Sequence, residues 1–133
     1  MINIAIDGPS GAGKSSIAKA VSSRLGYLYI DTGAMFRSLA YRALSLGIDI
    51  SNEHSKLKSM LSDTNLTIER IDGTQHMILD GCDITDKIRT PEVSKAASDI
   101  AVIDFIREWL LELERSLAKQ NNCIMDGRDI GTH

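Results

Sequence analysis

The stretch GPSGAGKS, residues 8–15, decides the fold. It follows a short apolar run, INIAI at residues 2–6, which has the length and composition of a buried parallel strand. Helical spacing begins at residue 14, and it predicts one buried face made of Ile17, Ala20, Val21 and Leu25. Gly26 is the predicted C-cap of this helix. A strand, a glycine loop and a helix in this order match the phosphate-binding loop in full.

The residue types in the loop suit a nucleoside triphosphate. Glycines let backbone N–H groups point at phosphate oxygens, and the helix that follows adds the positive end of its dipole. We expect Lys14 to reach the β- and γ-phosphates as the catalytic residue, and the Ser15 hydroxyl to bind Mg²⁺. The alternative, a turn that only joins a strand to a helix, is weak beside a full match. The predicted ATP-binding residues are Gly8, Pro9, Ser10, Gly11, Ala12, Gly13, Lys14, Ser15 and Ser16.

The rest of the chain alternates between strand and helix patterns. It predicts a strand at 27–30, helices at 31–46 and 53–61, a hairpin within 65–83, and a late strand at 122–127. Asp72-Gly73 marks the hairpin turn, and Pro91 marks the first turn of a helical region that reaches Lys119 with a break around 101–104. This order predicts an α/β fold with a parallel sheet and a small β-containing insertion.

Composition narrows the class of protein. The 133 residues fit one domain, and the net charge of −3 argues against a nucleic-acid-binding protein, which needs a basic face. Cys82 and Cys123 have no metal-ligand spacing and are expected to be two free buried thiols in a reducing compartment. No run of residues resembles a signal peptide or a membrane span, so the expected location is cytoplasmic.

Residues that follow the strands are candidates for a phosphate-acceptor site, because ligands of open α/β sheets bind at the carboxyl ends of the strands. Thr32 and Arg37 follow the second strand, and Asp126 ends the late strand, where an acidic residue usually acts on Mg²⁺. Each has a plainer alternative. Thr32 can be only a helix cap, Arg37 a solvated surface residue, and Arg128 a local ion-pair partner of Asp129.

Four motifs in this order, GPSGAGKS, DTGAMFR, IRTPEVSKAAS and DGRDIGT, resemble the bacterial cytidylate kinase family from the first residue to Thr132. The resemblance implies a P-loop nucleoside monophosphate kinase fold in residues 1–133, with a monophosphate-binding insertion at about 35–101. It also implies the reaction of ATP with CMP or dCMP to give ADP and the diphosphate, with Mg²⁺ as the metal.

The family's CMP-binding pattern falls on residues of this chain that match its motifs. These are Thr32, Arg37, Arg107, Arg128 and Asp129. Arg107 rests on the resemblance alone, since its position beside an apolar helical stripe indicates a solvated edge. Arginines suit an acceptor phosphate because they can bind it in bidentate fashion. The acceptor is already an ionised phosphate, so no general base is required.

The chain departs from the family after the fourth motif, where relatives continue through further strands and an arginine-bearing lid. We therefore expect the C-terminal part of the fold to be missing, residues 2–6 to form an exposed apolar edge, and the chain to be poorly stable or to self-associate, whereas a complete protein would be a monomer. Two other functions stay open: an inactive or nucleotide-binding remnant, and a kinase of another nucleoside monophosphate. A GTPase is disfavoured because the chain has no NKxD-like guanine signature.

Overall fold

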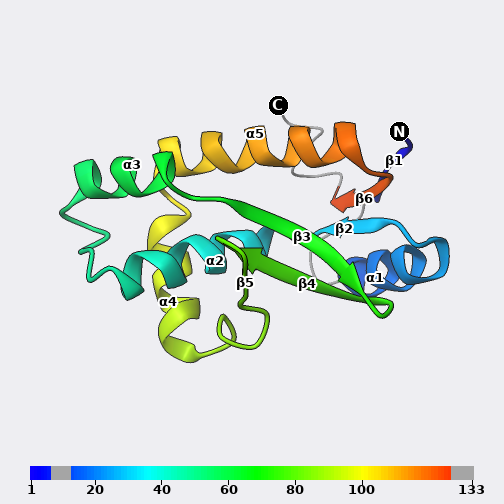
Figure 1. The fold of residues 1–133 in the computed structure, drawn as a ribbon, viewed down its shortest axis with the longest axis horizontal. Coiled ribbons are helices and arrows are strands. Elements are labelled where there is room, and N and C mark those ends of the chain that lie inside the picture. Colours follow the sequence, from blue (N-terminus) through cyan, green and yellow to red (C-terminus); the bar gives the residue numbers. More distant parts are fainter. Residues whose placement is uncertain (7–12, 127–133) are drawn as a thin grey trace. The chain divides into compact units, whose positions relative to one another are not determined.

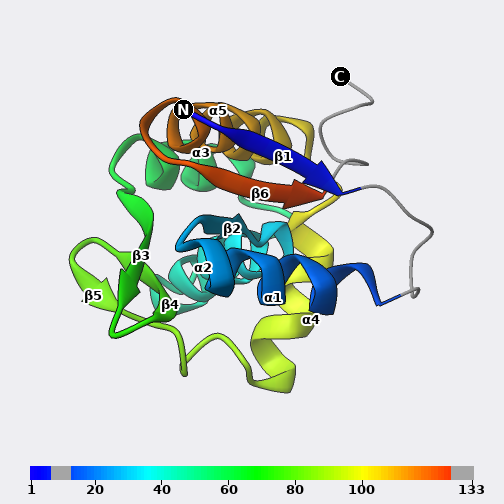
Figure 2. The ribbon, with the colours of Figure 1, turned by 90° about the vertical axis from the view of Figure 1, so that its right-hand side faces the viewer.

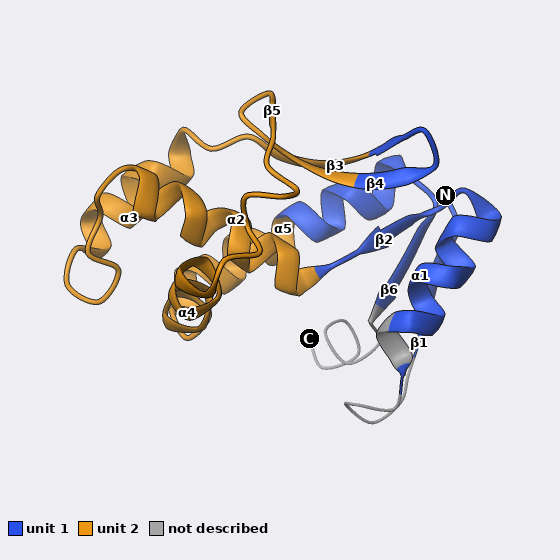
Figure 3. Cartoon of the chain, turned by 90° about the horizontal axis from the view of Figure 1, so that it is seen from below, with its two compact units in different colours: residues 1–31, 70–75, 113–133 blue, residues 32–69, 76–112 orange. Residues whose placement is uncertain are grey.

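The chain divides into two compact units, which are described separately (Figure 3). The computed structural model describes residues 1–6 and 13–126. Unit 1 comprises residues 1–31, 70–75 and 113–133, and unit 2 comprises residues 32–69 and 76–112.

Unit 1 is built on a parallel sheet with β6 in its centre (Figures 1 and 2). Its three strands, in the order β1-β6-β2, are β1 (Asn3–Ile6), β6 (Cys123–Asp126) and β2 (Leu28–Ile30). The predicted late strand therefore pairs with the strand that precedes the glycine loop, as expected. Ile124 is fully buried between its two neighbours, since Ile4 and Tyr29 are its register partners.

The helix α1 (Lys14–Leu25) packs against β6 and β2, and of the predicted face only Val21 packs against this core. Ala18 and Ser22 are buried, whereas Ile17 is 55% exposed and Leu25 is 50% exposed. The prediction of the α1 face was wrong because the helix presents its small side chains to the strands, where Ala18 joins Tyr29 and Ile124 in one cluster. The predicted C-cap is confirmed, since Gly26 has a left-handed φ of +71°.

Unit 2 is mainly helical. It contains α2 (Thr32–Ser45), α3 (His54–Ser62), α4 (Pro91–Ile100) and the first part of α5 (Asp104–Gln120), whose later residues belong to unit 1. The helices α2 and α4 pack together, and both bury small side chains, which include Ala40 and Ala43 on α2 and Ala96 and Ala97 on α4. The predicted start of α4 is confirmed: Pro91 is at its first position, and Thr90 Oγ1 accepts a hydrogen bond from the Val93 N–H. None of the described helices has the length and apolar character that a membrane span requires.

The predicted hairpin is present and carries a third short strand. It consists of β3 (Leu66–Ile71), β4 (Thr74–Leu79) and β5 (Cys82–Asp83). Asp72 and Gly73 both have positive φ, as the tight turn between β3 and β4 requires. β5 was not predicted, although Asp80-Gly81, also with positive φ, forms a second turn of the same type. Cys82 is exposed on this short strand, which corrects the expectation of two buried thiols, whereas Cys123 is buried.

Candidate functional site

The start of α1 has the backbone geometry of an anion site. Gly8, Pro9, Ser10, Gly11 and Ala12 lie outside the described residues. Gly13 is the N-cap of α1 with a left-handed φ of +76°, and its carbonyl accepts the first helical hydrogen bond, from Ile17 N–H, at 3.0 Å. The N–H groups of a first helical turn have no partner within the helix. Because Lys14, Ser15 and Ser16 occupy this turn and no acidic residue does, it offers donors and the positive end of the helix dipole to an anion.

The carboxyl ends of the three strands in unit 1 lie at one edge of the sheet. In the parallel register, Ile6 at the end of β1 is the partner of Asp126, and Ile30 at the end of β2 is the partner of Met125. Asp126 therefore ends β6 beside the strand from which the chain enters residues 7–12. This is the edge at which the sequence predicts the metal-binding carboxylate.

Three of the predicted acceptor residues belong to unit 2. Thr32 is the first helical residue of α2 and Arg37 lies in the second turn of that helix; both are half-buried. Arg107 is exposed on α5. Within the described residues, no hydrogen bond or ion pair engages the guanidinium of Arg37 or of Arg107. Arg128 and Asp129, the other two predicted acceptor residues, lie outside the described part of the chain.

Two other arginines, Arg42 and Arg70, bind groups of the protein itself. Arg42 Nε donates to Thr64 Oγ1 at 2.9 Å, and its Nη1 lies 2.8 Å from Asp80 Oδ2. Arg70 donates to the backbone carbonyl of Tyr27 at 3.3 Å and to that of Gly73 at 3.0 Å. These two guanidinium groups bind the protein itself, in contrast to those of Arg37 and Arg107 within the described residues.

None of the described groups with a shifted pKa is a predicted site residue. The pKa of the Asp83 carboxyl is lowered, mainly by the hydroxyl and N–H of Thr85 and also by His76, whose Nδ1 is 2.6 Å from Asp83 Oδ2. Burial raises the pKa of the Cys123 thiol on β6, which keeps it protonated. Neither group belongs to the predicted site.

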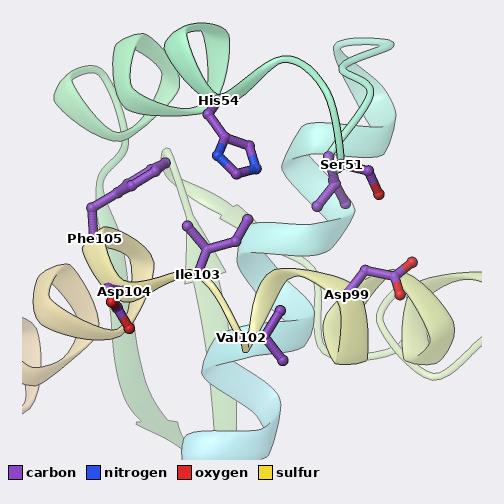
Figure 4. A pocket seen from close by; sticks show the side chains of 8 residues that line it. Ser51, His54, Asp99, Val102, Ile103, Asp104 and Phe105 are labelled. Atoms are coloured by element: carbon purple, nitrogen blue, oxygen red, sulfur yellow. The ribbon is translucent and has the colours of Figure 1, made fainter.

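A hollow of about 510 Å³ in unit 2 involves none of the predicted site residues (Figure 4). Its wall includes His54 and Phe105, whose rings meet edge to face with centroids 5.9 Å apart. Lys58 Nζ lies 5.1 Å from the Phe105 ring centroid. The Phe105 ring is thus already contacted by His54 and Lys58, and none of the residues that line the hollow is a predicted acceptor residue.

Comparisons with known proteins converge on one family. The profile of the cytidylate kinase family matches residues 4–133. The chain is similar to the cytidylate kinase of Caldicellulosiruptor bescii, with 52% identity over 132 residues, which are 99% of this chain and 58% of that protein. It is also similar to the cytidylate kinases of Desulfitobacterium hafniense and Geobacillus kaustophilus, each 48% identical over 132 residues, 99% of this chain and 56% and 58% of those proteins. The chain therefore spans somewhat more than half the length of the curated relatives it matches. With its parallel sheet and its glycine loop between β1 and α1, it belongs to the cytidylate kinase family, whose fold is that of the P-loop nucleoside monophosphate kinases.

Proposed function

We propose that this chain carries the ATP-binding loop and part of the acceptor site of an enzyme that phosphorylates CMP and dCMP. The observation that carries the proposal is that β1, which leads into the glycine loop, ends beside the carboxyl end of β6, where Asp126 is the partner of Ile6, and that α1 begins directly after the loop in the sequence. Relatives that match the chain over 99% of its length are named cytidylate kinases.

On the donor side, residues 8–16 would hold the triphosphate of ATP. The N–H groups at the start of α1 would donate hydrogen bonds to phosphate oxygens, and Lys14 would contact the β- and γ-phosphates. These groups neutralise the charge that builds up between the β- and γ-phosphates as the terminal P–O bond breaks. Lys14 is therefore the proposed catalytic residue.

The residues near the loop fit Mg²⁺ as the metal. Mg²⁺ prefers oxygen ligands and is commonly held by one or two carboxylates together with substrate phosphates and water. The Asp126 carboxylate and the Ser15 hydroxyl supply oxygen only, at the end of β6 and the start of α1. Among the described residues, no group of three His, Cys, Asp or Glu side chains forms a dedicated metal cage. When bound, Mg²⁺ would neutralise phosphate charge.

On the acceptor side, we propose that Thr32, Arg37, Arg107, Arg128 and Asp129 bind CMP, and that residues 35–101 form the monophosphate-binding insertion. An oxygen of the acceptor phosphate attacks the γ-phosphorus of ATP, and the bond from that phosphorus to the bridging oxygen of ADP breaks. Two arginine guanidinium groups without a described protein partner suit this step, because they can fix the acceptor phosphate in line with the donor.

The test is a phosphoryl-transfer assay on the 133-residue chain with Mg²⁺–ATP and CMP, dCMP, UMP or AMP in turn, together with calorimetric titration of each nucleotide. We expect CMP and dCMP to bind in preference to UMP and AMP, and the Lys14→Met variant to lose affinity for ATP. Lys19→Met, an exposed lysine of the same helix, is the matched control and should bind ATP like the parent chain.

Other results would replace the proposal by a named alternative. Preference for UMP or AMP would assign the chain to a kinase of that monophosphate. Nucleotide binding without transfer to any acceptor would indicate a binding remnant. We further propose the cytoplasm as the compartment of the protein, since the enzyme's substrates are free nucleotides.

A further inference from the structure

The outer edge of β2 is closed by a side chain rather than by a strand. Leu28 N–H donates to Asn122 O toward β6, so the N–H and C=O of the next residue, Tyr29, point to the opposite side. The side-chain amide of Gln75 takes both groups. Tyr29 N–H donates to Gln75 Oε1 at 2.8 Å, and Gln75 Nε2 donates to Tyr29 O at 2.6 Å. One glutamine thus supplies the two hydrogen bonds that a residue of a neighbouring strand would supply.

A second side chain extends this closure to Tyr27, two residues before Tyr29. Arg70, on the other strand of the hairpin, donates to the backbone carbonyl of Tyr27 and to that of Gly73 in the turn. The tight turn at Asp72 and Gly73 brings Arg70 and Gln75 together at the tip of the hairpin. All of these residues belong to unit 1, although most of the hairpin belongs to unit 2.

The closed edge lies immediately before the predicted acceptor residues. β2 has only three residues, and a single residue, Asp31, separates its end from Thr32, where α2 begins. β6 holds β2 on one side and Gln75 holds Tyr29 on the other, so the backbone is fixed on both sides three residues before Thr32.

We propose that Gln75 is a positioning residue for the acceptor site: its amide fixes β2 and so sets the point from which the chain enters α2 with Thr32 and Arg37. This inference rests on the proposed function, because those two residues are proposed there to bind CMP. The partners are 46 residues apart in sequence, and the contact depends on an amide, which can donate and accept at once.

Two variants separate the amide's chemistry from its size. Gln75→Met keeps the length of the side chain but removes both hydrogen bonds. Gln75→Glu keeps an acceptor for Tyr29 N–H but places a carboxylate against the Tyr29 carbonyl oxygen in place of a donor. Thr74→Ala, at the exposed neighbouring position of β4, is the matched control.

The experiment measures amide hydrogen exchange by NMR, together with the dissociation constants for CMP and ATP, in the 133-residue chain. In Gln75→Met we expect exchange of the Tyr29 N–H to be about tenfold faster, which is the net effect of the one hydrogen bond that this N–H loses, and we expect CMP to bind about tenfold more weakly. ATP affinity should stay within about twofold, since the donor loop does not depend on this contact. Gln75→Glu should also lose CMP affinity, and Thr74→Ala should match the parent chain.

Two results would overturn the proposal: unchanged exchange at Tyr29 in Gln75→Met, or equal losses of CMP and ATP affinity, which would mark Gln75 as a general stability residue. Failure of the parent chain to bind CMP would instead count against the proposed function. In that case the amide chemical shifts of residues 31–33 test whether Gln75 positions the start of α2. Shifts that change along these residues in Gln75→Met support positioning of the α2 start, and shifts confined to Tyr29 and Gln75 overturn it.

Discussion

The two outer edges of the unit 1 sheet contrast sharply. At the β2 edge, Gln75 and Arg70 bind the backbone of Tyr29 and Tyr27. At the β1 edge, the described residues provide no further strand, because β1 stands at the end of the order β1-β6-β2. Ile2, which directly precedes β1, is 54% exposed.

The difference shows how this fold satisfies the outer backbone groups of a strand that has no further strand beside it. The β2 edge is closed by polar side chains of the same chain, which satisfy its hydrogen-bonding groups. Among the described residues, no strand pairs with the outer side of β1, and the apolar side chains of Met1 and Ile2 beside it are exposed, a combination that favours pairing with another strand. We therefore interpret the β2 edge as closed by side chains, and we propose that another strand can pair with the β1 edge.

The largest effect on stability is expected in β6, because this strand pairs with both β1 and β2. Ile124→Ala removes a fully buried side chain from the centre of β6, next to Ala18 and Tyr29. A large-to-small change at such a site costs about 2–5 kcal/mol, so cooperative unfolding in urea should shift to much lower urea or be lost. Val102→Ala, at a position 77% exposed in unit 2, should change the free energy of unfolding by no more than about 0.5 kcal/mol. Equal effects of the two changes would contradict a core centred on β6.

The next effect concerns the open edge itself. We expect the 133-residue chain to self-associate through β1, with Ile2 contributing because its side chain is half exposed. Ile2→Lys should weaken association by about 1 kcal/mol, roughly fivefold in the association constant, since it removes about half the burial value of an isoleucine and adds a charge.

Sedimentation velocity at several protein concentrations measures this change. Ile71→Lys, an exposed isoleucine at the hairpin tip, is the control and should associate like the parent chain. A parent chain that sediments as a monomer at every concentration would show that the β1 edge does not act as a pairing surface.

The hairpin that closes the β2 edge is also fixed at its other end, within unit 2. There Arg42 on α2 contacts Asp80 in the turn after β4, and Asp80 Oδ1 accepts a hydrogen bond from Asn65 N–H at 2.8 Å. Arg42→Met should destabilise the protein by about 1–3 kcal/mol, the usual range for a hydrogen bond to a charged group.

A double-mutant cycle isolates this contact. If Arg42 and Asp80 act as a pair, the effects of Arg42→Met and Asp80→Asn on the free energy of unfolding will be less than additive when combined. Additive losses would show that the two residues stabilise the hairpin independently.

Local patterns were enough to predict the elements that carry the candidate site. The glycine loop between β1 and α1, the helix after β2, and the hairpin with its Asp72-Gly73 turn each have a signal within a few residues. The late strand ending in Asp126 was also predicted from its apolar residues, and it lies in the parallel sheet beside β1. Periodicity and turn residues express backbone preferences that act locally, so they can be read without the rest of the chain.

The predictions failed where contacts between residues far apart in the sequence determine which side chains are buried or bonded. Spacing alone predicted that Ile17 and Leu25 face the core, but the helix packs on its small residues, Ala18 and Ser22. Nothing around Gln75 predicts that its amide closes a strand in the first third of the chain. Such choices depend on which surfaces meet in three dimensions, and a single sequence does not contain that information in local form.

The smallest effect on stability is expected at the outer edge of the other sheet, where β5 pairs with β4. The folded protein lowers the pKa of Asp83, chiefly through the hydrogen bond from Thr85 Oγ1, and His76 adds a further contact. A carboxyl with a lowered pKa stabilises the fold above its unfolded pKa of about 4, and this contribution is lost as the pH falls through the lower folded value.

Thermal unfolding between about pH 5 and pH 2 should therefore depend less on pH in Asp83→Asn than in the parent chain. Asp86→Asn, an exposed aspartate without a described side-chain partner, should leave the pH dependence unchanged. Because Asp83 is exposed, the difference between the variants should be small. An equal change in both variants would mean that the loss of stability in acid comes from the general charge of the chain rather than from the β4–β5 edge, and closure by polar side chains would then be confined to β2.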